Sequence, residues 1–128
     1  MNEPRILIVD DNKTNLKLAS DVLAFEGYKI LNASDAESAQ EIIRKTPPDL
    51  ILMDIALPGM DGLTLTRLLK LDESTRRIVV VALTASAMKG DDARAREAGC
   101  DGYITKPIDT RTFPNVVAAY LRARGGDA

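Results

Sequence analysis

The sequence predicts a single α/β domain in which a five-stranded parallel sheet is covered by helices on both faces. Short apolar runs alternate five times with segments of helical periodicity, which is the pattern of repeated βα units. The runs are apolar throughout, as expected for parallel strands that are buried on both faces. The length of 128 residues suits one domain with a substantial core. We therefore predict a doubly wound α/β fold.

The predicted strands are apolar runs that end at polar or turn-forming residues. Their sequences are RILIVD (5–10), YKILNA (28–33), DLILMD (49–54), IVVVAL (78–83) and GYIT (102–105). The fourth run is the most uniformly apolar, and the fifth is the shortest. Each run is followed by a helical pattern, so the connections predict parallel neighbours.

The predicted helices follow from apolar spacing and from the residues that start and stop a helix. Their apolar positions are Leu16, Ala19, Val22 and Leu23 in the first, Ala39, Ile42 and Ile43 in the second, residues within 63–71 in the third, and Phe113, Val116, Val117, Tyr120 and Leu121 in the last. Gly27 ends the first helix. Ser34 and Glu37 form a capping-box pattern that predicts the start of the second, and Pro47 with Pro48 ends it.

The later helices have weaker but interpretable end signals. Asp61 is the expected cap of the third helix. A short stretch over residues 91–98 predicts a fourth helix that stops at Gly99. Pro114 is tolerated only in the first turn of the last helix, so we expect Thr112 to be its cap.

Composition excludes several classes of partner and location. The chain has 17 Lys and Arg against 19 Asp and Glu, a formal net charge of −2, which gives no reason to expect nucleic acid or an anionic membrane. No apolar run is long enough to cross a bilayer, and the start MNEPR lacks the pattern of a signal peptide. We expect a cytoplasmic protein.

Cysteine and histidine usage limits the chemistry further. Cys100 is the only cysteine, so no internal disulfide forms, and we interpret it as a core residue. The chain contains no histidine. This excludes Ser-His-Asp and Cys-His catalysis and the common zinc sites. The remaining chemistry depends on carboxylates, hydroxyls and lysines.

Polar side chains gather where the predicted strands end. Asp10 and Asp11 close the first strand, Asp54 closes the third, Thr84 follows the fourth and Lys106 follows the fifth. In open parallel sheets the carboxyl ends of the strands form the ligand-binding edge. An aspartate after a strand is often only a helix cap, but capping gives no reason for three acids to converge. We therefore expect these five side chains to share one site.

A divalent cation explains the three acids, because like charges at close range repel and raise one another's pKa. An all-oxygen site with few protein ligands suits Mg²⁺, which keeps several waters. With the charge neutralised, Asp54 can act as a nucleophile toward a phosphoryl group. Lys106 and Thr84 would stabilise the transferred oxygens.

Four motifs carry a resemblance to a known family. They are VDDN (9–12), LILMDIALPGMDG (50–62), ALTASA (82–87) and YITKPI (103–108). In this order and spacing the chain resembles the receiver domain of two-component response regulators. The resemblance covers nearly the whole chain, implies a flavodoxin-like (CheY-like) fold, and places the domain at residues 1–128 with a core of about 4–123. We expect no output domain.

The resemblance implies a role for each acid. Asp54 would be the phosphoacceptor and would take the phosphoryl group from the phosphohistidine of a sensor kinase or a histidine phosphotransfer protein. Asp11 and Asp54 would bind Mg²⁺ directly, Asp10 through a water, and Ala56 through its backbone carbonyl. The partner would supply the histidine that this chain lacks.

The same resemblance assigns the switch residues. Thr84 would bond the phosphoryl oxygens, Tyr103 would rotate inward, and Lys106 would pair with the phosphoryl group. The peptide bond from Lys106 to Pro107 would be cis, as it is in the family. Ala56, and Ser86 two residues after the threonine, stand at positions through which family members differ in phosphoryl lifetime.

These implications predict a signalling switch that catalyses only its own phosphorylation and dephosphorylation. Phosphorylation would stabilise one of two conformations and change the affinity for a downstream protein. An aspartyl-phosphate phosphatase is an alternative, but it requires a second aspartate where Ala56 stands. A flavodoxin-like FMN binder is another, but residues 10–15 read DDNKTN and not a glycine- and hydroxyl-rich phosphate loop. No P-loop motif occurs.

Overall fold

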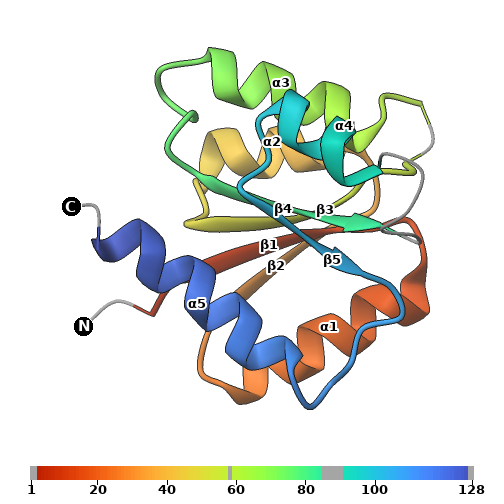
Figure 1. The fold of residues 1–128 in the computed structure, drawn as a ribbon, viewed down its shortest axis with the longest axis vertical. Helices are drawn as coiled ribbons and strands as arrows, with labels where there is room; N and C mark the ends of the chain where they lie inside the picture. The colour runs from red at the N-terminus through yellow and green to blue at the C-terminus, as the bar shows by residue number, and fades with distance from the viewer. Residues whose placement is uncertain (1–2, 58, 85–90, 127–128) are drawn as a thin grey trace.

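The computed structural model describes residues 3–57, 59–84 and 91–126, in which strands and helices alternate five times (Figure 1). The strands are β1 Arg5–Val9, β2 Lys29–Ala33, β3 Leu50–Asp54, β4 Val79–Thr84 and β5 Gly102–Thr105. The helices are α1 Lys13–Phe25, α2 Ala36–Lys45, α3 Gly62–Leu71, α4 Asp91–Ala98 and α5 Phe113–Gly126. These bounds confirm the predicted βα order, and no strand end differs from its predicted position by more than one residue.

All five strands are parallel and form one sheet in the order β2-β1-β3-β4-β5. The order reverses direction at β1, since the chain passes from β1 outward to β2 and then back across to β3. A doubly wound fold binds its ligands at such a point. The carboxyl ends of β1 and β3 therefore lie side by side at the expected functional edge.

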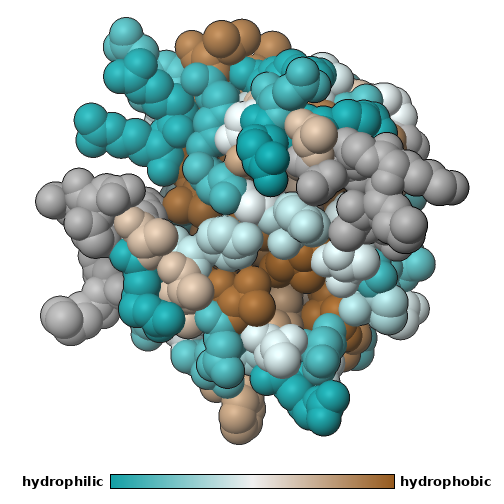
Figure 2. Space-filling model, viewed as in Figure 1, coloured by the Kyte–Doolittle hydropathy of each residue, from teal (hydrophilic) through white to brown (hydrophobic). Residues whose placement is uncertain are grey.

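Helices cover both faces of the sheet, α2, α3 and α4 on one and α1 and α5 on the other (Figure 1). Alternate residues of each strand enter the two layers. Leu7 and Val9 pack toward α2 and α3 with Ile51, Met53 and Val80, whereas Ile6 and Ile8 pack toward α1 and α5 with Leu50, Leu52 and Val81. This double burial explains why the central strands β1, β3 and β4 are almost uniformly apolar. Figure 2 shows hydrophobic residues at the surface between α1 and α5, bordered by hydrophilic ones.

Two of the helix starts differ from the prediction. The first helix begins at Lys13, earlier than Leu16, because Asn12 caps it by accepting a hydrogen bond from the backbone N–H of Asn15 at 3.0 Å. The predicted capping box of Ser34 and Glu37 is wrong. Asp35 is the cap of α2, since its carboxylate accepts from the backbone N–H and the hydroxyl of Ser38, each at 2.7 Å. An ionised acceptor there also interacts favourably with the helix dipole.

The later helix ends agree with the prediction. Asp61 caps α3 and accepts a hydrogen bond from the backbone N–H of Thr64 at 2.8 Å. Gly99 follows α4 with a φ of 103°, a left-handed conformation that favours glycine. Thr112 directly precedes α5, and its carbonyl accepts from the backbone N–H of Val116 at 3.0 Å. Pro114 then lies in the first turn of the helix.

Cys100 packs among core residues, as the sequence predicts. It is partly buried against two hydrophobic clusters, and its Sγ lies 4.0 Å from the hydroxyl of Thr66. Burial raises the pKa of the Cys100 thiol above its ordinary value. A raised thiol pKa lowers reactivity at neutral pH, so the structural interpretation stands. In the part of the chain that the structure describes, no helix has the length and hydropathy of a bilayer span.

Candidate functional site

The fold delivers the predicted polar side chains to one edge of the sheet. Asp10 directly follows β1, Asp54 and Thr84 are the last residues of β3 and β4, and Lys106 directly follows β5. Val9 pairs with Met53 in the parallel register, so the next residues, Asp10 and Asp54, lie at the carboxyl ends of adjacent strands. The chain therefore brings acidic groups together by strand order and register alone.

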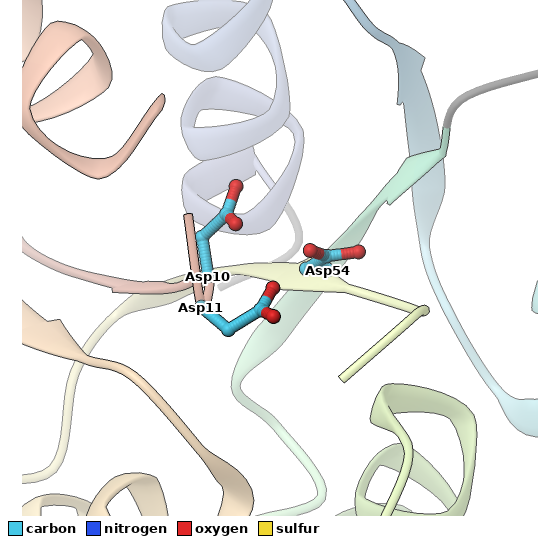
Figure 3. A group of neighbouring side chains, drawn as sticks. All are labelled: Asp10, Asp11 and Asp54. Atoms are coloured by element: carbon cyan, nitrogen blue, oxygen red, sulfur yellow. The ribbon is translucent and has the colours of Figure 1, made fainter. Parts of the chain in front are cut away.

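Three carboxylates form a cluster at this edge, as Figure 3 shows for Asp10, Asp11 and Asp54. One carboxylate oxygen from each lies within 4.8 Å of the other two. Asp10 and Asp54 are buried, with relative exposures of 1% and 4%, whereas Asp11 is exposed. The site thus combines two desolvated acids with one that reaches solvent.

Local turns fix the two buried carboxylates. Oδ1 of Asp10 accepts a hydrogen bond from the backbone N–H of Asn12, and Oδ1 of Asp54 accepts one from the backbone N–H of Ala56, both at 2.9 Å. In each case the donor lies two residues after the acid, which is the geometry of an Asx turn. The same two short contacts hold one oxygen of each carboxylate and leave the second oxygen for other partners.

Lys106 joins both buried acids. Its Nζ lies 3.1 Å from Oδ2 of Asp54 and 3.2 Å from Oδ2 of Asp10. Its backbone N–H donates to the carbonyl of Thr84 at 2.7 Å. Burial acts to lower the pKa of Lys106, but the hydrogen bonds and charges of Asp54 and then Asp10 outweigh it, and the pKa is raised. Lys106 is therefore held as a cation at this edge of the sheet. The peptide bond from Lys106 to Pro107 is cis, as predicted.

For the pKa of Asp10, burial is the dominant influence. Burial raises the pKa of Asp10 above its ordinary value of 3.8, although the hydrogen bond from Asn12 and the charge of Lys106 act to lower it. The nearby charge of Asp54 raises it further. One ammonium does not fully compensate two buried carboxylates, so the edge favours an additional cation.

A cleft of about 510 Å³ opens at this edge of the sheet. Its lining includes six of the predicted site residues, namely Asp10, Asp11, Asp54, Ala56, Thr84 and Lys106. Tyr103 does not line the cleft, lies on β5 and is 36% exposed. Ser86 lies outside the described residues.

Three residues near the cleft were not singled out from the sequence. Asn15 of α1 and Arg94 of α4 line it. Gly62 packs directly beneath the site, because a Cβ atom there would collide with the backbone carbonyl of Asp54 and lie 2.8 Å from the Cγ of Met53. The available signal for Gly62 was its place at the end of the motif LILMDIALPGMDG (50–62), directly after the cap Asp61.

The donor chemistry of the acidic cluster fits a hard divalent cation. Its three carboxylates offer only oxygen ligands, and such sites select Mg²⁺ or Ca²⁺ over softer metals. The exposed Asp11 faces solvent beside the buried Asp54, so a cation can be bound while it keeps part of its hydration shell. The group Asp10, Asp11 and Asp54 could therefore hold a metal ion.

Comparison with known proteins places this site in a family. The model of the response regulator receiver domain matches residues 6–118. The polar-differentiation response regulator DivK of Brucella ovis is 45% identical over 123 residues, which cover 96% of this chain and 97% of the relative. The chain is thus similar to a DivK protein over nearly its whole length.

Solved structures share the same architecture. A CheY-like receiver domain protein from Methanospirillum hungatei superposes with a TM-score of 0.89 at 29% identity and covers 99% of this chain and 100% of its own. The chemotaxis response regulator CheY4 of Vibrio cholerae, at 21% identity, covers 93% and 99% with a TM-score of 0.88. The second comparison supports the flavodoxin-like fold alone. Taken with the sequence match and the acidic edge, these findings show that the chain belongs to the response regulator receiver domain family of two-component signalling.

Proposed function

We propose that this receiver accepts a phosphoryl group on Asp54 from the phosphohistidine of a sensor kinase or of a histidine phosphotransfer protein. The observation that carries the proposal is the contact of one buried carboxylate with a lysine on one side and two acids on the other. Asp10 has the same kinds of neighbour, since Lys106 also lies 3.2 Å from its Oδ2. We assign the acceptor role to Asp54 because it is the aspartate of the motif LILMDIALPGMDG (50–62), through which the chain resembles receiver domains. The absence of histidine from the sequence means that a partner protein supplies the donor group.

The transfer step is a displacement at phosphorus. A carboxylate oxygen of Asp54 forms a bond to phosphorus while the P–N bond of the phosphohistidine breaks, and its electron pair stays on the imidazole nitrogen. Mg²⁺ bound by Asp11 and Asp54, with Asp10 acting through a water and the carbonyl of Ala56 completing the set, would neutralise charge on the transferred oxygens. This role is consistent with the all-oxygen donor set of the cluster.

Lys106 and Thr84 would stabilise the product. The ammonium of Lys106 already lies 3.1 Å from the acceptor carboxylate, so it can follow the charge onto a phosphoryl oxygen with little movement. Thr84 lines the same cleft from the end of β4. We propose that the Thr84 hydroxyl forms a hydrogen bond with the phosphoryl group and that Tyr103 moves inward in response. This movement would change the surface around β5 to which a downstream protein binds.

Intact mass spectrometry tests the acceptor. The protein is incubated with Mg²⁺ and a small acyl phosphate, and the mass of one phosphoryl group is followed in the wild type and in Asp54→Asn. We expect a hydroxylamine-sensitive adduct that requires Mg²⁺ and is lost in the variant, because an acyl phosphate forms only on the carboxylate. Asp21→Asn is the matched control, since Asp21 is exposed on α1 in an ion pair with Lys17. An adduct that survives in Asp54→Asn would reject Asp54 as the acceptor.

A further inference from the structure

We infer that Arg94 of α4 supplies a second cation to the phosphoryl group on Asp54, an inference that rests on the proposed function. Arg94 lines the same cleft as the acidic cluster, Thr84 and Lys106. It lies on α4, a helix that contains none of the site residues predicted from the sequence.

The geometry of α4 directs Arg94 toward the site. Ala95 and Ala98 are each 3% exposed and pack α4 against Leu63 of α3 and Ala82 of β4. Arg94 precedes Ala98 by four residues, which places it on the same side of the helix, one turn nearer its start. Because α4 follows β4 in a parallel sheet, its start lies at the carboxyl edge. Helical side chains lean toward the helix N-terminus, so the side chain of Arg94 leans toward the cleft.

The charges of the phosphorylated site favour such a cation. Phosphorylation replaces the single charge of the Asp54 carboxylate with nearly two charges on the phosphoryl oxygens, and Asp10 and Asp11 remain beside it. A bound Mg²⁺ together with Lys106 leaves about one negative charge uncompensated. The charge of Arg94 brings the net charge of the site close to zero. An unbalanced charge costs more free energy at this edge than in water, because the dielectric constant is lower there.

Lys106 alone is poorly placed to satisfy the three phosphoryl oxygens. Its ammonium has three donors and already contacts Asp10 and Asp54 at 3.2 and 3.1 Å. A guanidinium offers five N–H donors in a planar fork that matches phosphate oxygens. The structure therefore assigns different work to the two cations. Lys106 connects the two buried acids, and Arg94 would contact the transferred group from the part of the cleft that α4 lines.

Binding of the fluoroberyllate ion, an inert mimic of a phosphoryl group, tests the inference in Mg²⁺ buffer. We expect Arg94→Ala to weaken this binding roughly tenfold, which is the low end for a hydrogen bond to a charged group, and Arg94→Lys to recover part of the loss. Arg96→Ala is the matched control, because Arg96 is exposed on the same helix and does not line the cleft. It should bind the mimic as the wild type does.

A Mg²⁺ titration without the mimic separates contact from damage. Removing a nearby cation should leave Mg²⁺ affinity unchanged or slightly raised, whereas a distorted site would bind both ions more weakly. Unchanged mimic binding in Arg94→Ala, or equal loss of mimic and Mg²⁺ binding, would overturn the role of Arg94. If the wild type itself binds neither the mimic nor a phosphoryl group, the proposed function fails first, and that outcome is distinct from a failure confined to the variant.

Discussion

Neutralising Asp54 should stabilise the folded protein in metal-free buffer. Carboxylate oxygens of Asp10 and Asp11 lie within 4.8 Å of an oxygen of Asp54, so each repulsion costs about 3.5 kcal/mol at an effective dielectric constant of about 20. The attraction between Asp54 and Lys106 at 3.1 Å stabilises the folded state by about 5 kcal/mol at the same effective dielectric constant. Two repulsions exceed one attraction, and burial of an ionised group adds a further cost. We expect Asp54→Asn to gain roughly 1–2 kcal/mol in the free energy of unfolding.

Urea unfolding in a chelating buffer measures this gain, and the same experiment with Mg²⁺ supplies its counterpart. A ligand that binds only the folded state adds about 2.7 kcal/mol to the free energy of unfolding when its concentration is about 100 times its Kd. Mg²⁺ should therefore stabilise the wild type more than Asp54→Asn. The stability advantage of the variant should become smaller or change sign. Asp21→Asn removes a carboxylate from an exposed ion pair and should change stability by less than about 0.5 kcal/mol in either buffer.

The refuting result is specific. If Asp54→Asn is less stable than the wild type in the chelating buffer by more than about 1 kcal/mol, the carboxylate makes a net favourable contribution to the fold. The acidic cluster would then be a structural ion network around Lys106. If Mg²⁺ stabilises the wild type and Asp54→Asn equally, the cation binds away from Asp54.

Three further predictions follow from single contacts. Gly62→Ala should displace the backbone carbonyl of Asp54, with which the new Cβ would collide, and so lose about 1–3 kcal/mol of stability by urea unfolding together with Mg²⁺ affinity by titration. Cys100 should react with a disulfide reagent much more slowly than the unfolded chain does, because burial raises the pKa of its thiol; equal rates would show an accessible thiol. The hydrogen bonds that lower the pKa of Asp35 below 3.8 contribute stability above that pH, which is lost as the pH falls through the lowered folded value. The stability difference between the wild type and Asp35→Asn should therefore shrink below about pH 4 in acid-side urea titrations, and a constant difference would contradict it.

The central strands β1, β3 and β4 were predictable because their burial on both faces requires continuous apolar runs. The edge strands β2 and β5 are only partly buried. The helix starts were less predictable. The first turn of α1 contains Lys13, Thr14 and Asn15, and none of them carries the apolar period that would have marked a start before Leu16. At α2, Ser34 and Asp35 are adjacent and are both good capping residues. Only the contact of the Asp35 carboxylate with Ser38 decides between them.

The site was predictable where it depends on strand ends and not where it depends on packing between distant elements. Asp10, Asp54 and Lys106 each stand at the end of an apolar run, so the topology rule for parallel sheets was enough to bring them together. Arg94 comes from a helix with few apolar residues, and its approach to the cleft depends on how α4 packs against α3 and β4. Gly62 has no side chain to signal a role, and its contact appears only in three dimensions.

The strand order gives the reason for the position of the acidic pair within the fold. β1 and β3 are neighbours in the sheet, and Val9 pairs with Met53. The residues that follow this pair, Asp10 and Asp54, therefore lie side by side at the point where the strand order reverses. A register shift of one residue would turn every core side chain of β1 to the opposite face, so the packing of Val9 and its neighbours against α2 and α3 also holds Asp10 beside Asp54. The repulsion between the acids is thus sustained by core packing, and a bound cation or a phosphoryl group can relieve it without moving the strands.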